Sequence, residues 1–301
     1  MNASAGKVLL SGSSGLVGSA LIPALETNAY QVTRLVRSGP SGEGRLVWDP
    51  AKPLAPESVS GFDAVVHLAG ESVVGRWTAA KKAAIRESRV LGTRNLAEGL
   101  AKASRPPRLL ISASAIGYYG DRGEEVLREN SASGEGFLPV VCREWEAATE
   151  PAAKVGIRTT QIRIGVVLSA AGGALQKMLP PFRLGLGGNM GNGRQWWSWI
   201  DVADLVGAVH HIMQAESLCG PVNMVAPNPV KNSEFTRILA SVLSRPAIFP
   251  MPAFAARLAF GQMADELLLA SQRVEPAKLL ASGYVFQRRD LRQALLAILE
   301  K

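Results

Sequence analysis

The stretch Lys7–Gly18, KVLLSGSSGLVG, constrains the fold more than any other part of the sequence. An apolar run, Val8–Leu10, leads into three glycines, and residues 19–25 follow with helical spacing. A buried strand that passes through a glycine loop into a helix forms an anion site, because backbone N–H groups at the helix start point toward the ligand. The G-x-x-G-x-x-G spacing also occurs in ordinary turns. The prediction of an anion site therefore depends on the strand before the glycines and the helix after them.

The composition is that of a globular protein. The chain has 301 residues, 47% of them hydrophobic and 19% charged, which suits one large domain or a domain with a smaller cap. No apolar run approaches the roughly 18 residues of a membrane span, and the start MNASAGK lacks a secretory signal. Cys142 and Cys219 have no CxxC spacing, which favours a reducing compartment. We therefore expect a cytoplasmic protein with no membrane partner.

The formal net charge of +8 raises the question of a nucleic-acid partner. The lysines and arginines are dispersed, and they are not interleaved with aromatic residues as in RNA-binding proteins. We therefore expect no nucleic acid and instead a small anionic ligand. The pair His210–His211 has no acidic or cysteine partner at metal-ligand spacing, so we expect no metal.

Strand and helix patterns alternate through the first half of the chain. Strands are expected at 7–11, 31–36, 45–49, 63–68, 108–113 and 158–164, and helices at 16–27, 78–103 and 138–154. Such alternation requires right-handed crossovers and a parallel sheet covered on both faces. The predicted fold class is α/β, a doubly wound, Rossmann-like parallel sheet.

The pattern loosens after Gly165. We assign 1–165 to the nucleotide-binding core and 166–301 to a smaller, mostly helical substrate or cap region. Within the latter, 201–226 reads as a helix and a strand that can return to the sheet. Helices are also expected at 232–243, with Asn232 as the N-cap, and at 253–271 and 289–300. The Gly-rich stretch Gly185–Arg194 is the candidate for a mobile substrate loop.

Ligands on doubly wound sheets bind beyond the carboxyl ends of the strands. Val36 and Arg37 follow the second strand, where an NAD-selective site usually has an acidic residue that accepts the ribose 2′-OH. Arg37 instead suits a 2′-phosphate and favours NADP, although a solvated arginine is the alternative. Leu68 and Ala69 follow the fourth strand, and His67 before them is expected to be a satisfied core histidine.

Several segments together resemble an atypical extended short-chain dehydrogenase/reductase, of the sugar-nucleotide epimerase-like (YfcH-type) family. The segments are Gly12–Gly18, His67–Gly70, Ser112–Gly120, Trp145–Glu146, Arg163–Leu168, Leu184–Gly188 and Arg273–Val274. The resemblance spans nearly the full length and implies NADP bound across the strand ends. It implies cofactor contacts from Gly12, Ser14, Gly15, Leu16, Val17, Val36, Arg37, Leu68, Ala69, Arg89 and Val166.

The chain departs from that family pattern at the catalytic positions. Typical members use a serine with Tyr-x-x-x-Lys, in which the lysine lowers the tyrosine pKa. Ser114 matches the serine, but Cys142 and Glu146 stand where tyrosine and lysine would be. A glutamate there raises the pKa of the cysteine instead. Three substitutes for the acid/base are open: Tyr118 or Tyr119, Glu146 acting directly, or Cys142. A fourth possibility is that no residue takes this role.

Two functions follow from these patterns. The first is an NADP-dependent oxidoreductase or epimerase that transfers hydride to and from a nucleotide sugar or similar anionic metabolite. The second is a catalytically silent NADP(H)-binding or redox-sensing protein, which the missing tyrosine and lysine favour. The resemblance also implies a homodimer paired through helices 78–103 and 138–154.

Overall fold

The computed structural model describes residues 6–299, and a parallel sheet of seven strands runs through its first two thirds. The strand order is β11-β7-β5-β4-β1-β2-β3. The strand bounds are β1 Lys7–Ser11, β2 Gln31–Val36, β3 Arg45–Val47, β4 Ala64–His67, β5 Leu109–Ala115, β7 Arg158–Ile164 and β11 Gly220–Met224. The sequence order reverses between β1 and β4, which makes their carboxyl ends the topological switch point.

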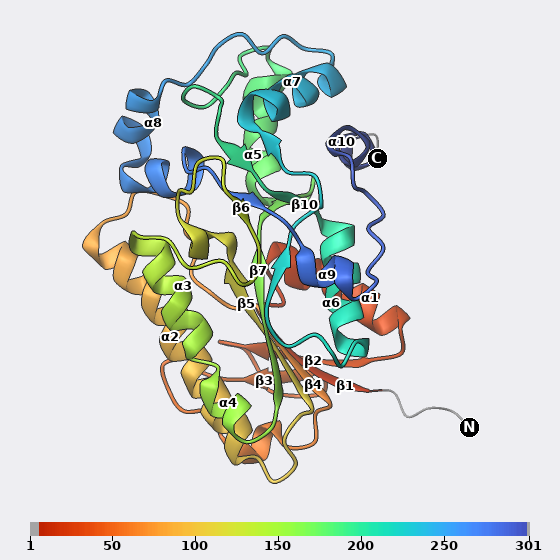
Figure 1. Cartoon of the computed structure of the whole chain (residues 1–301). Coiled ribbons are helices and arrows are strands. Elements are labelled where there is room, and N and C mark those ends of the chain that lie inside the picture. Colours follow the sequence, from red (N-terminus) through yellow and green to blue (C-terminus); the bar gives the residue numbers. More distant parts are fainter. Residues whose placement is uncertain (1–5, 300–301) are drawn as a thin grey trace.

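Helices cover both faces of the sheet, as Figure 1 shows with the sheet nearly edge-on. On one face α1 (Leu16–Thr27) and α6 (Val202–Gln214) pack over a cluster that includes Leu10 and Val66. On the other face α2 (Ala79–Lys102) packs over Leu9 and Val65. Neighbouring residues of one strand point to opposite faces, so continuous apolar strands serve both layers. The predicted doubly wound α/β fold is confirmed.

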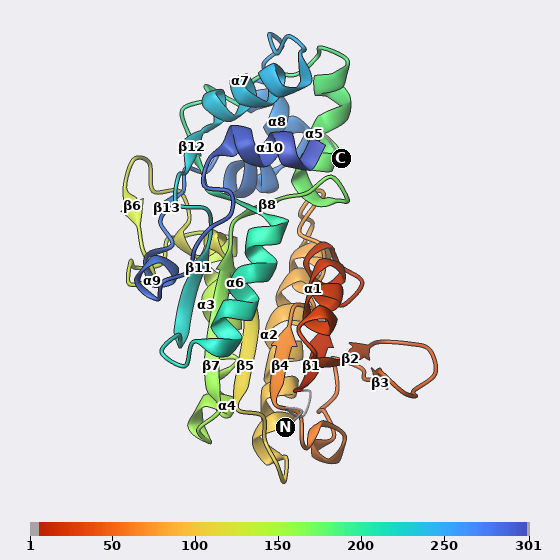
Figure 2. The ribbon, with the colours of Figure 1, turned by 90° about the vertical axis from the view of Figure 1, so that its right-hand side faces the viewer.

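The chain beyond Ile164 builds a second apolar cluster above the carboxyl ends of the strands (Figures 1 and 2). It centres on Trp197, Trp199 and Phe235. The elements around it are β8 (Val166–Leu168), α5 (Gly173–Arg183), β9 (Trp196–Trp197), β10 (Trp199–Asp201), β12 (Val230–Lys231), α7 (Asn232–Leu243) and α10 (Leu291–Leu299). β11 leaves this region and pairs with β7, so the segment 201–226 does return a helix and a strand to the sheet.

The remaining elements are short. They are η1 (Pro56–Val59), η2 (Ile116–Tyr119), β6 (Val126–Leu127), α8 (Ala253–Phe260), the π-helical turn η3 (Ala264–Leu268), β13 (Arg273–Val274) and α9 (Ala277–Ala281). β13 pairs with β6, which ties residue 273 of the chain to residue 126. Within residues 6–299, no helix has both the length and the apolar character needed to cross a bilayer.

Three sequence expectations are wrong in detail. The helix expected at 138–154 is two helices, α3 (Phe137–Ala147) and α4 (Glu150–Lys154), because Pro151 has no N–H to continue the α3 ladder. The helix expected at 253–271 ends at Gly261, whose φ of +61° breaks it before η3. Asn232 lies inside α7 rather than at its N-cap, and its side chain accepts a hydrogen bond from the Met190 N–H.

Candidate functional site

The predicted glycine loop joins β1 to α1 at the switch point of the sheet. Gly12 has a φ of +71°, and a Cβ there would lie 2.7 Å from the carbonyl carbon of Leu68. A Cβ on Gly18 would collide with the Gly12 carbonyl oxygen, so only glycine lets α1 start this close to β1. Gly12 and Gly18 are therefore needed for close contact between backbone segments, which an ordinary surface turn does not require.

The start of α1 is open to an anion. Gly15 is its N-cap, and within the described chain no side chain caps the helix there. The N–H groups of Leu16, Val17 and Gly18 occupy the first turn, where an α-helix has no internal acceptors. Ser14 lies exposed beside them on the loop. Free N–H groups and the positive end of the helix dipole favour a phosphate at this place.

The loop after β4 lies against the glycine loop. The Ser11 hydroxyl accepts hydrogen bonds from the Leu68 N–H at 3.2 Å and from the Ala69 N–H at 3.4 Å. The loop after β8 approaches from the other region, because a Cβ on Gly173 would lie 2.9 Å from Leu16. Val166, the last of the predicted cofactor contacts, lies on β8 just before that loop. The structure thus brings the predicted loop residues to one edge of the sheet.

Cations gather around the carboxyl ends of β2 and β4. Arg37 follows Val36 at the end of β2 and is exposed, and Arg89 of α2 donates to the Glu71 carbonyl oxygen at 2.9 Å. Lys81 forms an ion pair of 2.6 Å with the Glu71 carboxylate and lowers its pKa, with smaller contributions from Arg37 and Arg89. Three cations surround one carboxylate, so this edge retains a positive charge that suits a phosphate-rich ligand.

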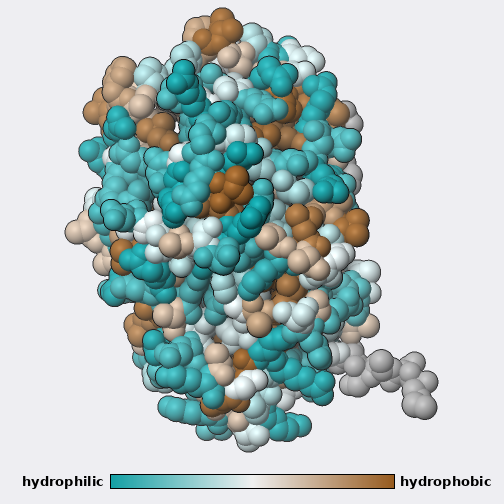
Figure 3. Space-filling view, viewed as in Figure 1, coloured by the Kyte–Doolittle hydropathy of each residue, from teal (hydrophilic) through white to brown (hydrophobic). Residues whose placement is uncertain are grey.

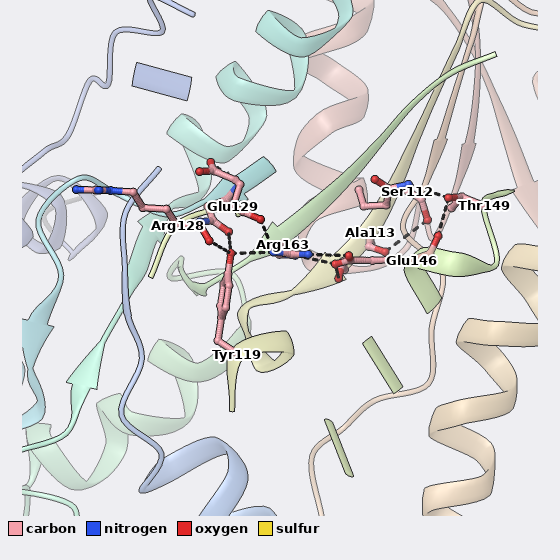
Figure 4. Close-up of polar contacts among 11 residues, drawn as sticks. Ser112, Ala113, Tyr119, Arg128, Glu129, Glu146, Thr149 and Arg163 are labelled. Carbon is pink, nitrogen blue, oxygen red and sulfur yellow. Dashed lines mark hydrogen bonds and ion pairs between the residues drawn. The ribbon is translucent and has the colours of Figure 1, made fainter. Parts of the chain in front are cut away.

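Ser114 lies at the end of β5 and belongs to a buried polar network, in which Figure 4 shows Arg163 pointing at Glu146. The Ser114 hydroxyl donates to Glu146 Oε1 of α3 at 2.7 Å. Arg163 of β7 holds the same carboxylate with two hydrogen bonds of 2.8 Å, from Nε to Oε1 and from Nη2 to Oε2. The Arg163 side chain is 3% exposed and that of Glu146 is 14% exposed, so both charges are largely removed from water. The pairing fixes the position of the Glu146 carboxylate, which accepts the hydrogen bond of Ser114.

The two tyrosines after β5 lie in different surroundings. Tyr118 is half-buried, and its ring centre lies 3.5 Å from the Arg163 guanidinium carbon. Tyr119 is fully buried, donates to Asn223 Oδ1 at 2.7 Å and accepts from Arg163 Nη1 at 3.0 Å. Burial raises the pKa of Tyr119 to about 12. Tyr119 is therefore a core residue, whereas Tyr118 has the exposure that an acid or base needs.

Cys142 of α3 lies in the interior and is 2% exposed. Burial raises the pKa of its thiol to about 12, and the neighbouring Glu146 adds to that rise. A thiol with so high a pKa stays protonated at neutral pH and is a poor acid or base. Cys142 behaves as a small apolar residue.

Sequence reasoning missed Arg163 as a member of this network. It is 2% exposed in β7, between the apolar residues Ile162 and Ile164. A charged residue at a buried position of a central strand was a signal, since a buried charge requires a partner. The partner, Glu146, lies 17 residues earlier on another element. The distance along the chain hid the pair.

His67 is buried, as expected, but only one of its two ring nitrogens has a hydrogen-bond partner among the described residues. Its Nδ1 lies 2.6 Å from the Ser11 hydroxyl, while Nε2 has no hydrogen-bond partner among the described residues. Because Ser11 also accepts from two backbone N–H groups, its own proton is directed at Nδ1. Burial lowers the pKa of His67 to about 4, so the ring is neutral at physiological pH.

Comparison with known proteins places this geometry in a family. The model of the NAD dependent epimerase/dehydratase family matches residues 8–224, and a domain of unknown function (DUF1731) matches 251–298. The epimerase family protein Mb2239 of Mycobacterium bovis is 42% identical over 96% of this chain and 96% of its own.

Solved structures extend the likeness to the whole fold. The crystal structure of human epimerase family protein SDR39U1 with NADPH has a TM-score of 0.90 and 35% identity, covering 98% of this chain and 99% of that one. A nucleoside-diphosphate sugar epimerase from Corynebacterium glutamicum has a TM-score of 0.82 and 42% identity, covering 98% of this chain and 58% of that one. The matching family model and the full-length relatives confirm the predicted resemblance, and the chain belongs to the NAD dependent epimerase/dehydratase family.

Proposed function

We propose that this protein binds NADP(H) across the carboxyl ends of β1, β2 and β4. The observation that carries the proposal is the uncapped start of α1 at the switch point, faced by more cations than carboxylates. The pyrophosphate would lie on the N–H groups of Leu16 and Val17. The human relative, 35% identical over nearly the full chain, was crystallised with NADPH, which supports the same cofactor here.

Arg37 is the residue that would select NADP over NAD. None of the hydrogen bonds or ion pairs within residues 6–299 engages its side chain, so the guanidinium is available to a 2′-phosphate. The acidic residue of an NAD site is replaced by this arginine at the end of β2. Arg89, held against Gly70 by its bonds to Glu71 and Ile85, would contribute at the neighbouring strand end.

The proposed reaction is hydride transfer with a nucleotide sugar or a similar anionic metabolite. Bound NADP would accept or return the hydride at its nicotinamide ring. Ser114 would orient the reacting hydroxyl, and Glu146, anchored by Arg163, would hold the serine hydroxyl in position. Tyr118, which is half-buried, would carry the proton. The relative from Corynebacterium glutamicum is titled a nucleoside-diphosphate sugar epimerase, which supports this substrate class.

A silent NADP(H)-binding or redox-sensing protein is the second candidate. The contacts of Glu146 favour it, because Arg163 and Ser114 already occupy both of its carboxylate oxygens, which leaves the carboxylate less free to contact a substrate. The buried thiol of Cys142 likewise cannot stand in for the missing tyrosine. This candidate predicts cofactor binding without any redox change on addition of substrate.

Two further parts of the proposal concern organisation. We assign 1–165 to cofactor binding and 166–301 to substrate binding, with β11 returned to the sheet. We also propose a homodimer through α2 and α3, whose outer faces carry the exposed apolar residues Leu91 and Val140. Sedimentation velocity of the wild type and of Leu91→Ser with Val140→Ser tests that contact.

The first experiment is a fluorescence titration with NADPH and NADH. Wild type should prefer NADPH, and Arg37→Ala should weaken NADPH binding by about 10- to 100-fold, the effect of one lost charge-assisted hydrogen bond. NADH binding should not change. Arg34→Ala, an exposed arginine earlier on β2, is the matched control. Equal affinity of the wild type for both nucleotides would contradict the assignment.

A nucleotide-sugar screen then separates the two candidates. At least one nucleotide sugar should be oxidised, reduced or epimerised by the protein with bound NADP. Nicotinamide absorbance detects a net oxidation or reduction, and NMR of the sugar detects an epimer, which forms without net absorbance change. Ser114→Ala should abolish the conversion while leaving NADPH binding intact, and Tyr118→Phe tests the proton carrier in the same assays. If no nucleotide sugar is converted in either assay while NADPH still binds tightly, the silent protein is the better description.

A further inference from the structure

Two segments above the sheet, one before β9 and one that runs into α8, carry a concentration of exposed apolar side chains. Of the thirteen large apolar residues exposed within residues 6–299, seven lie in the two segments 184–186 and 248–258. Met251 is 39% exposed, and the other six are each more than half exposed. We call these six the apolar tip: Leu184, Leu186, Ile248, Phe249, Phe254 and Leu258. Single exposed apolar residues are ordinary, but a group of this size marks a contact surface.

The two segments are joined by main-chain hydrogen bonds. The Phe249 N–H donates to the Gly187 carbonyl oxygen at 3.0 Å, and Arg245 Nε donates to the Arg183 carbonyl oxygen at 3.1 Å. The backbone of Gly188 passes so close to the Phe249 carbonyl that a Cβ would collide with it. The segment 185–194 is therefore held against 247–251 rather than free, and the apolar tip has a defined backbone.

The apolar tip protrudes rather than lining a groove. The side chains of Leu184, Ile248, Phe254 and Leu258 are each more than 70% exposed. Figure 3 shows apolar side chains over α8 at the upper left and at the top of the molecule, where the segment before α8 runs in Figure 1. A groove that receives a partner helix leaves its apolar residues partly covered. Projecting side chains suit insertion into a soft apolar medium.

Among the described residues, unpaired arginines lie beside part of the apolar tip, next to Leu184 and before Ile248, whereas Arg257 of α8 forms an ion pair with Asp265 at 2.8 Å. Residues 173–195 contain three cations, Lys177, Arg183 and Arg194, and no carboxylate. Residues 232–260 contain three arginines and the single carboxylate of Glu234. None of the ion pairs formed within residues 6–299 includes Arg183 or Arg245, which directly flank the tip. The partner of such a surface is both anionic and apolar.

We propose that the apolar tip docks this protein on an anionic lipid bilayer. The bilayer supplies acyl chains for the six side chains and phosphate headgroups for Arg183 and Arg245. A second copy of the chain fits less well, because a two-fold contact would bring these unpaired arginines together. The sequence predicts no membrane partner, because no apolar run approaches the length of a spanning segment, but docking at the surface needs no such segment.

Vesicle co-sedimentation of the full-length protein tests the proposal. The protein should sediment with vesicles of phosphatidylcholine and phosphatidylglycerol in equal parts, and much less with phosphatidylcholine alone. Added salt should release it. Phe254→Ser with Leu258→Ser should weaken binding about tenfold or more, since two large apolar side chains no longer insert. Arg183→Gln with Arg245→Gln should weaken it about fivefold for each cation removed.

Val285→Ser is the matched control, because Val285 is 81% exposed but lies outside the tip. It should bind the anionic vesicles as the wild type does, and an unchanged NADPH titration shows that each variant is folded. Binding that Phe254→Ser with Leu258→Ser does not reduce would overturn the proposal, as would no binding at all. So would self-association in sedimentation velocity that the same pair of substitutions abolishes, which identifies a second copy as the occupant.

Discussion

Arg163 supplies, within a single side chain, the positive charge that a lysine provides in typical short-chain dehydrogenases. The group that this charge contacts differs, however, because the guanidinium forms an ion pair with the Glu146 carboxylate and lies over the ring of Tyr118. The guanidinium is therefore engaged with Glu146 and does not point at a tyrosine hydroxyl in a substrate position. This arrangement orients Ser114 and leaves Tyr118 as the group with access to solvent.

Loss of Arg163 should be costly for stability. Arg163→Met leaves the Glu146 carboxylate largely buried without its main partner, which costs about 3–5 kcal/mol in the free energy of unfolding. Adding Glu146→Gln should recover at least about 1 kcal/mol, because the two residues act as a pair. Urea denaturation of the two single variants and the double variant measures this coupling.

Arg86 is the control for that cycle. It pairs with Glu144 on the same helix as Glu146, but its side chain is 52% exposed. Arg86→Met should cost no more than about 1 kcal/mol, as for other surface pairs. Strictly additive effects of Arg163→Met and Glu146→Gln would show that the buried pair is not coupled.

His67 should make stability depend on pH. The pKa of its imidazole is about 4 in the folded protein and 6.5 when unperturbed. Between these two pH values the unfolded chain is protonated at His67, whereas the folded protein is not. Stability should fall as the pH drops from about 6.5 toward 4, by up to about 3 kcal/mol. The urea midpoint measured across that range should slope less in His67→Gln. Parallel slopes for the two proteins would exclude His67 as the cause.

At the scale of elements, the π-helical turn η3 is fastened to the start of α3. The Glu266 carboxylate accepts hydrogen bonds from the Phe137 N–H at 3.1 Å and from the Leu138 N–H at 2.7 Å. Gly136 precedes them as the N-cap, and within the described chain no other side chain caps this helix. A carboxylate from the region matched by DUF1731 thus caps the helix that carries Cys142 and Glu146.

Removing this cap should loosen α3. Glu266→Ala leaves two N–H groups without acceptors and should cost about 1–2 kcal/mol of unfolding free energy. Amide hydrogen exchange in the first turn of α3 should accelerate more than in α2. Asp265→Ala is the neighbouring control, because Asp265 pairs with Arg257 on the surface. Equal effects of the two substitutions would mean that the cap contributes little.

At the scale of the whole molecule, the sheet and the second apolar cluster meet above the carboxyl ends of the strands. The family model matches from residue 8 to residue 224, which is from β1 to the end of β11. A cavity of about 280 Å³ lies where the two regions meet, lined by residues that include Gly117, Leu138 and Glu266. The region after β11 therefore forms one wall beside the end of β5 and the start of α3.

The sequence by itself determined the sheet, its helices and the glycine loop. These depend on local patterns, since the spacing of Gly12, Gly15 and Gly18 and the apolar runs of the strands act on neighbouring residues. The positions after the strands followed from topology, because parallel strands bring their carboxyl ends to one edge.

Only the tertiary structure decided which charges meet. Arg163 contacts Glu146 from another element, and Glu266 reaches Leu138 across 128 residues. Local propensity does not encode such pairs, because they depend on how helices and strands dock after they form. The same holds for the break at Pro151 and for the apolar tip, whose two segments lie about 60 residues apart in sequence and are joined by main-chain bonds such as Phe249 to Gly187.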